Sequence, residues 1–154
     1  MNYTWEKIKE RIYFADGSLR DIYINNITEE QWGIWINYVN NNYNVEWNNK
    51  NKIDFDIIKQ NWKENNNPGL AKIFIGNIQI NCHFFCDFEN DIDPNEVQYI
   101  NDHNSIIKYM KNISELFNTA VFLSVENAHF LLNENVHDYY FLKVYKDEII
   151  WNIE

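Results

Sequence analysis

Pairs of β-prone runs joined by very short turns are the feature that most constrains how this chain can fold. In residues 72–85 the two runs are separated only by Gly76 and Asn77, a two-residue turn of the kind that closes antiparallel hairpins. Similar pairs occupy residues 11–24, around an Asp-Gly turn, and residues 139–153. Because strands joined by so short a turn run in opposite directions, the sequence predicts a mostly antiparallel sheet.

A helix that begins at Thr28 is the second strong signal. Thr28 and Gln31 have the spacing of a capping box, in which the side chain of each residue binds the backbone N–H of the other. The apolar residues that follow recur at i, i+3, i+4 and i+7, the spacing of a helix face that packs against a core. These residues are Trp32, Trp35, Ile36 and Val39. We therefore expect these four side chains to be buried against the sheet.

Weaker signals complete the predicted order of elements. They predict a strand over residues 43–47 and a buried strand over residues 120–125. One helix is capped by Asp54 and carries Phe55, Ile58 and Trp62 on one side. Another helix begins at Asp93 and continues to Asn118, with a break or kink at residues 101–105. Hairpins that dominate over interspersed helices are typical of α+β domains. We expect a single domain over residues 1–154, with an antiparallel sheet of about seven or eight strands and about three helices packed mainly on one face.

The composition is that of a folded domain in aqueous solution. Hydrophobic residues make up 45% and aromatic residues 17% of the chain, which excludes a disordered tail. No apolar run approaches the roughly 18 residues that cross a bilayer, and the N-terminal residues lack the features of a secretory signal. Two cysteines are too few for a disulfide scaffold. These observations favour a cytoplasmic protein of bacterial type with no membrane partner.

The net charge of −10 is unevenly distributed along the sequence. Residues 1–77 carry a charge of −1, whereas residues 78–154 carry −9. Nucleic-acid binding depends on Lys and Arg that displace counterions from phosphates, so a nucleic-acid partner is not expected. A basic protein partner or a metal cation would instead be attracted.

The segment from Cys82 to Cys86 contains His83 and invites comparison with a metal site. In a strand, Cys82 and Cys86 lie on the same face as Ile78, whereas His83 lies on the other face. The spacing also differs from that of the Cys-x-x-Cys sets that bind zinc. We therefore predict two reduced cysteines in the core, no metal site and no cofactor.

Four acidic residues, Asp87, Glu89, Asp91 and Asp93, recur at every second position. A solvated acidic loop before the predicted third helix is the default interpretation, because carboxylates are favourable at a helix N-terminus. Protein contact and adventitious calcium are the alternatives. An EF-hand is excluded because Ile92 would occupy the position that requires glycine. We take the four acids as candidate partner-binding residues, which would form a negative patch that steers a basic protein toward this surface.

A catalytic site is not indicated by any local motif. The chain has only four glycines and contains no nucleophile elbow, phosphate-binding loop, dinucleotide fingerprint or zinc-protease helix. His and Ser residues are present, but no spacing brings them together as a base and a nucleophile. No catalytic residue is therefore predicted, and the chain is more readily interpreted as a protein without enzymatic activity.

The sequence leaves three functional hypotheses. The first is a protein-binding domain that masks a basic partner, by analogy with the class of immunity and antitoxin proteins. The second is a small enzyme or small-ligand-binding protein with a loop-built pocket near the helix-rich face. The third is an accessory protein that forms homo-oligomers, such as a homodimer, through exposed strand edges or aromatic side chains.

Overall fold

Eleven helices and strands are described in the computed structural model, which covers residues 20–24, 27–76, 78–84, 88–92, 104–125 and 142–151. In chain order these are β1 (Arg20–Ile24), α2 (Glu29–Asn42), β2 (Asn44–Trp47), α3 (Phe55–Lys63), β3 (Leu70–Ile75), β4 (Ile78–Phe84), β5 (Phe88–Ile92), α5 (Asn104–Phe117), β6 (Val121–Val125), β7 (Leu142–Tyr145) and β8 (Glu148–Trp151). None of the helices in these ranges is long and apolar enough to span a bilayer.

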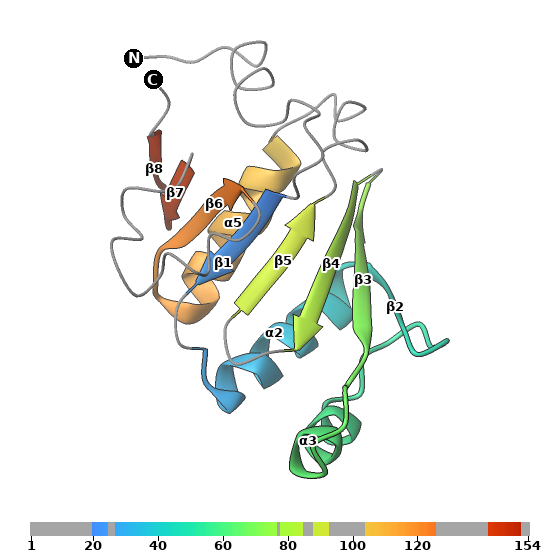
Figure 1. The fold of residues 1–154 in the computed structure, drawn as a ribbon. Helices are drawn as coiled ribbons and strands as arrows, with labels where there is room; N and C mark the ends of the chain where they lie inside the picture. Colours follow the sequence, from blue (N-terminus) through green and yellow to red (C-terminus); the bar gives the residue numbers. More distant parts are fainter. Residues whose placement is uncertain are drawn as a thin grey trace.

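All eight strands form one sheet in the order β2-β3-β4-β5-β1-β6-β7-β8, with every neighbouring pair antiparallel (Figure 1). The prediction of an α+β fold with an antiparallel sheet is therefore confirmed. The first strand, β1, lies between β5 and β6, so a segment from the start of the chain pairs with two segments from its second half. This placement brings residues that are far apart in the sequence onto neighbouring strands.

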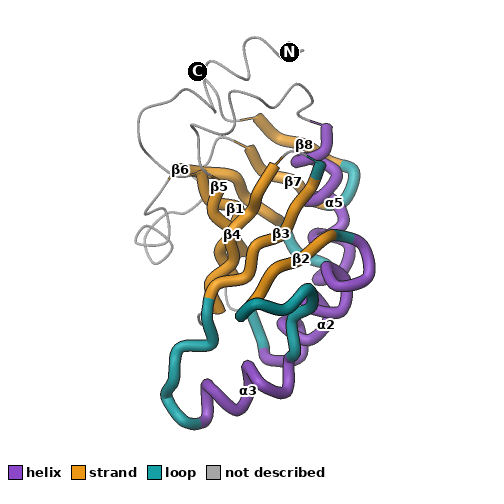
Figure 2. Tube along the Cα trace, turned by 90° about the vertical axis from the view of Figure 1, so that its right-hand side faces the viewer, coloured by secondary structure: helices purple, strands orange, loops and turns teal. Residues whose placement is uncertain are grey.

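The core lies between the sheet and the helices. Figure 2 shows α2 and α5 on the same side of the strands, with α3 beyond one end of the sheet. Alternate residues of β3 and β4 are buried, as expected for strands with one face against a core. The predicted stripe of α2 is buried in the same cluster, which confirms the prediction for Trp32, Trp35, Ile36 and Val39.

The N-terminus of α2 has the predicted capping box. The Gln31 backbone N–H donates to Thr28 Oγ1 at 3.1 Å, and the Thr28 backbone N–H donates to Gln31 Oε1 at 2.8 Å. Both groups would otherwise lack an intrahelical acceptor, because the first turn of a helix has unpaired N–H groups. The helix therefore begins where the sequence predicts it.

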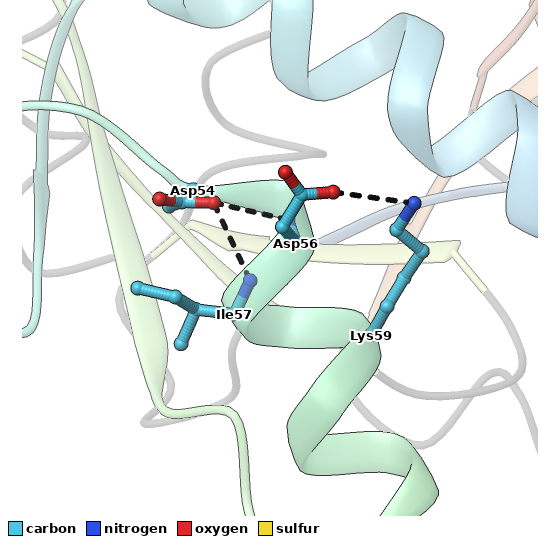
Figure 3. A network of polar contacts seen from close by, with 4 residues as sticks. All are labelled: Asp54, Asp56, Ile57 and Lys59. Atoms are coloured by element: carbon cyan, nitrogen blue, oxygen red, sulfur yellow. Dashed lines mark hydrogen bonds and ion pairs between the residues drawn. The ribbon is translucent and has the colours of Figure 1, made fainter.

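Helix α3 begins at the predicted cap (Figure 3). Asp54 Oδ1 accepts hydrogen bonds from the backbone N–H groups of Asp56 and Ile57, at 3.0 and 3.3 Å. Asp56 also forms an ion pair with Lys59 at 3.4 Å. As predicted for this helix, Ile58 is buried in the core.

The predicted strand near residue 45 is β2, and the hairpin around Gly76 is β3–β4, with Ile75 opposite Ile78. Gly76 has a positive φ of 60°, which a two-residue hairpin turn requires and glycine adopts at low cost. The closing hairpin is also present as β7–β8, and the strand predicted near residue 121 is β6.

The acidic segment differs from the prediction of a loop. Residues 88–92 form β5, a strand between β4 and β1. The physical reason is the period of two: neighbouring strand residues alternate between the two faces, and Asn90, which stands between two acids in the sequence, is fully buried. The segment 11–19 and the helix predicted from Asp93 lie outside the described residues, while α5 is described from Asn104 onward.

Candidate functional site

A groove of about 810 Å³ lies where α2, α3 and the end of β4 meet. Its floor is formed by aromatic and apolar residues, namely Ile27, Trp32, Trp62, Pro68 and Phe84. Its rim is formed by Glu29 and by the asparagines at positions 65–67, all of which are exposed. In Figure 1 the arrowhead of β4 ends beside α2, with α3 below it. We call this feature the Trp32–Trp62 groove.

The aromatic floor is held in a fixed arrangement. Trp62 Nε1 donates a hydrogen bond of 3.1 Å to the backbone carbonyl of Phe84, which ties α3 to the end of β4. The Trp32 ring lies 5.3 Å from Phe84 and 6.4 Å from Trp62, measured between centroids. Phe55 packs edge-on against Trp62 at 6.0 Å and is not among the residues that line the groove. Trp62, which is partly buried, is thus supported by Phe55 and presents its surface to the groove next to Trp32.

Side-chain hydrogen bonds order the rim between α3 and β3. Asn67 Oδ1 accepts from the backbone N–H of Gly69 at 2.9 Å, which stabilises the turn into β3. The carbonyl of Pro68 accepts from Trp47 Nε1 at 2.8 Å, so the rim is bound to the edge strand β2. Asn66 Nδ2 donates to Glu64 Oε2 at 3.3 Å, which holds a second carboxylate beside the rim. The groove is therefore formed before any ligand binds.

The described residues that line the groove supply groups that can bind a ligand. They comprise one carboxylate, three carboxamides and three aromatic rings. Aromatic rings with a few polar groups at the edge are typical of surfaces that bind a peptide or a small organic ligand. The groove can therefore accept an apolar, aromatic or cationic group, with Glu29 favouring a positive charge.

Two further hollows, of about 690 and 650 Å³, surround the loop that follows β2. Lys50 lines both hollows. The larger one is also lined by Glu46 and Lys72, and the smaller one by Lys52 and Asp54. These walls are polar and carry positive as well as negative groups. They provide neither the aromatic floor nor the negative rim of the Trp32–Trp62 groove.

Two of the four predicted partner-binding acids fall on a described strand. Glu89 and Asp91 occupy positions in β5, where Glu89 is opposite His83 and Asp91 is opposite Asn81. On the other side of β5, Asp91 is paired in register with Asp21 of β1, whose side chain is 1% exposed. Asp87 and Asp93 lie outside the described residues. Their role in partner binding stays a prediction.

Cys82 and His83 have the arrangement expected from the strand period. Cys82 is fully buried in the core cluster, whereas His83 is partly exposed on the opposite face of β4. Within the described part of the chain, no three His, Cys, Asp or Glu residues come together as a metal site would require. Cys86 lies outside the described residues.

A buried polar chain connects α2, α5 and β5. Trp35 Nε1 donates to the Tyr109 hydroxyl at 3.1 Å, and that hydroxyl donates to Asn90 Oδ1. Burial, and then the nearby Cys82, raises the pKa of Tyr109 well above its usual value. Since both ends of this buried polar chain of hydrogen bonds are enclosed in the core, we infer that it stabilises the fold.

Sequence reasoning placed Trp32 and Trp62 on the core-facing sides of two helices but did not bring them together. The pairing depends on the carbonyl of Phe84, which carries no signal in the sequence. Comparison of the chain with models of protein families gives no match, and comparisons with curated proteins and with solved structures give none either.

Proposed function

We propose that this chain is a non-enzymatic protein-binding domain of the immunity or antitoxin type, which acts in the cytoplasm and masks a basic surface of its partner. The single observation that carries the proposal is the Trp32–Trp62 groove, where an aromatic floor and the Glu29 carboxylate lie together on a chain with a net charge of −10.

Aromatic side chains support this proposal because Trp and Tyr are enriched among the residues that contribute most to protein binding. They contribute most when they are rigid, since less conformational entropy is lost on association. Trp62 meets that condition through its hydrogen bond to Phe84 and its packing against Phe55. A partly buried tryptophan that is already held in place can cover a partner side chain without first being ordered.

Net charge supports the choice of a basic partner. A domain of charge −10 repels acidic proteins and accelerates the approach of basic ones, over a distance set by the ionic strength. Asp87, Glu89, Asp91 and Asp93 are a predicted contribution to this attraction.

The test is to capture the partner with the full chain, purify it and measure the complex by calorimetry at several salt concentrations. The expected result is a saturable complex with a basic protein, whose affinity falls as salt rises and which forms more weakly with Trp62→Leu than with the native chain. A matched control is Tyr145→Ala, because Tyr145 is an exposed aromatic residue, 39% accessible, on the β7–β8 hairpin. An acidic partner, or an affinity unaffected by salt, would contradict the proposal.

Small-ligand binding is a second candidate, favoured by the size of the groove. Drug-sized ligands occupy sites of about 300–1,000 Å³, and the groove volume of about 810 Å³ lies in that range. A screen of small aromatic and cationic compounds by thermal shift tests this alternative. Stabilisation by a compound that is lost in Trp62→Leu but retained in Tyr145→Ala would favour it over protein binding.

A further inference from the structure

We infer that the Trp32–Trp62 groove binds one arginine side chain of the partner, with the guanidinium stacked on Trp62 and paired with Glu29. This inference rests on the proposed function and specifies the chemistry of its contact. It commits to an arginine of a basic protein and not to a free small molecule.

Trp62 offers a partner the surface of its ring. Its only hydrogen-bond donor, Nε1–H, is already engaged by the Phe84 carbonyl, so the remaining interaction is through the face and edge of the ring. The negative face of an indole attracts cations more strongly than the rings of Tyr or Phe. Elsewhere in this chain cations already use such surfaces, since Lys59 Nζ lies 4.7 Å from the centroid of Phe55. Among the described residues no lysine or arginine stacks on Trp62.

The groove also contains one carboxylate, that of Glu29. Glu29 is exposed in the first turn of α2 and lines the same groove. The ion pair found among the described residues joins Lys59 to Asp56, so Glu29 has no cationic partner there. An apolar partner side chain would cover this carboxylate without compensating its lost hydration, and an acidic one would be repelled. A cation satisfies both Trp62 and Glu29.

Arginine and lysine differ in how well they fit this lining. A guanidinium is planar, so it can lie flat on an indole while its edge donates hydrogen bonds to a carboxylate. It is also less strongly hydrated than an ammonium group, which lowers the cost of moving it into an aromatic groove. The asparagines at positions 65–67 also line the groove, and their carboxamide oxygens are acceptors for further guanidinium N–H groups. Arginine therefore fits the lining better than lysine.

The experiment uses the full chain and four capped pentapeptides that contain a central Arg, Lys, citrulline or Leu between glycines. Citrulline has nearly the shape of arginine but no charge, so it isolates the contribution of the cation. Each peptide is titrated to tens of millimolar while the indole N–H signals are followed by NMR. We expect the Trp62 signal to shift with the Arg peptide, less with the Lys peptide, and little with the citrulline and Leu peptides.

Variants locate the contact. Glu29→Gln should weaken the Arg peptide roughly threefold, as expected for loss of an exposed ion pair. The matched control is Glu46→Gln, because Glu46 is also exposed but lies on β2 and lines a different hollow. Trp62→Leu should weaken binding about tenfold through loss of the stacked ring. Glu29→Gln leaves the floor of the groove unchanged, so it tests the inference even if the Trp62 variant folds poorly.

Several results would overturn the inference. They are equal binding of the Arg and citrulline peptides, preference for the Leu peptide, absence of any shift, or equal effects of Glu29→Gln and Glu46→Gln. Failure of this inference is distinguishable from failure of the proposed function. A captured basic protein that binds Trp62→Leu more weakly than the native chain but binds Glu29→Gln as tightly would overturn this inference and leave the proposed function standing.

Discussion

Replacement of Trp35 by alanine tests the packing of α2 against the sheet. Trp35 is fully buried in the middle of α2, and its ring centroid lies 5.7 Å from that of Trp32 and 6.2 Å from that of Phe84. Its Nε1–H donates to the hydroxyl of Tyr109. The variant therefore removes a large apolar surface, leaves a cavity between helix and sheet, and deletes the donor at one end of the buried polar chain.

The expected loss of unfolding free energy is about 3–5 kcal/mol, the range for Trp or Phe replaced by Ala in a core. For a domain of this length, that loss corresponds to a decrease in the melting temperature of roughly 6–20 °C. Trp35→Phe separates the two contributions, because it keeps an aromatic ring and removes only the donor. We expect it to cost about 1–2 kcal/mol, the value of a buried hydrogen bond together with a small change in packing.

The assay is urea unfolding followed by circular dichroism, with the free energy obtained by linear extrapolation. Tyr145→Ala is the surface control; because it removes an exposed hydrogen bond to Asn118, it should change the unfolding free energy by no more than about 1 kcal/mol. If Trp35→Ala remains within about 1 kcal/mol of the native chain, the ring does not pack as described. If Trp35→Phe costs as much as Trp35→Ala, the hydrogen bond to Tyr109 outweighs the cavity, and the reasoning from packing is refuted.

Three further predictions follow from the described contacts. Cys82 is fully buried, so peptide mapping should show slow thiol labelling in the native protein and fast labelling in denaturant, whereas fast native labelling would contradict its place in the core. Thr28→Ala should lower the unfolding free energy by about 1 kcal/mol, because it removes the acceptor for the Gln31 N–H. Thr28→Ser should retain most of that stability, and equal losses for the two variants in urea unfolding would argue against the cap. Because burial raises the pKa of Tyr109 in the folded state, the unfolded chain loses that proton first, and the unfolding free energy should decrease as pH rises above about 10. Tyr109→Phe should flatten this dependence, and an unchanged slope would show that other groups cause it.

Local signals explain which elements could be predicted from the sequence. The start of α2 depends on two side chains three residues apart, and the β3–β4 hairpin depends on a turn that requires positive φ at Gly76. In both cases the interactions that determine the structure lie within a few residues of one another. Such interactions are visible in one sequence because they don't depend on the rest of the fold.

The strand β5 could not be predicted from local composition because three of its five residues are polar and two of these are acidic. Phe88, Asn90 and Ile92 form the alternate set, and Asn90 is an unusual residue to bury. The burial of Asn90 is explained by the hydroxyl of Tyr109 in α5, which donates a hydrogen bond to the side-chain oxygen of Asn90. The tertiary contact between Asn90 and Tyr109 therefore explains a strand at a segment whose local composition predicts a loop.

The groove could not be predicted for a related reason. Its floor combines Trp32 from α2, Trp62 from α3 and Phe84 from β4, three elements whose pairing is set by the sheet order. The sequence placed both tryptophans on apolar helix faces, which is where a core residue is also found. What makes Trp62 part of a groove is that it remains partly exposed after the helix has packed, and that property belongs to the folded chain.

In the fold, strands from the two differently charged halves of the sequence lie side by side. Although −9 of the net −10 belongs to residues 78–154, β1 lies between β5 and β6, so Asp21 from the first half stands opposite Asp91 from the second. The two halves of the sequence are therefore not two faces of the molecule, and Glu29, the acid that lines the groove, belongs to the nearly neutral half. Net charge then acts mainly on the rate at which a basic partner approaches, while the contact itself depends on individual side chains. A strong salt dependence of association with no loss in Glu29→Gln would thus support attraction by the whole domain and argue against an ion pair between the partner and Glu29.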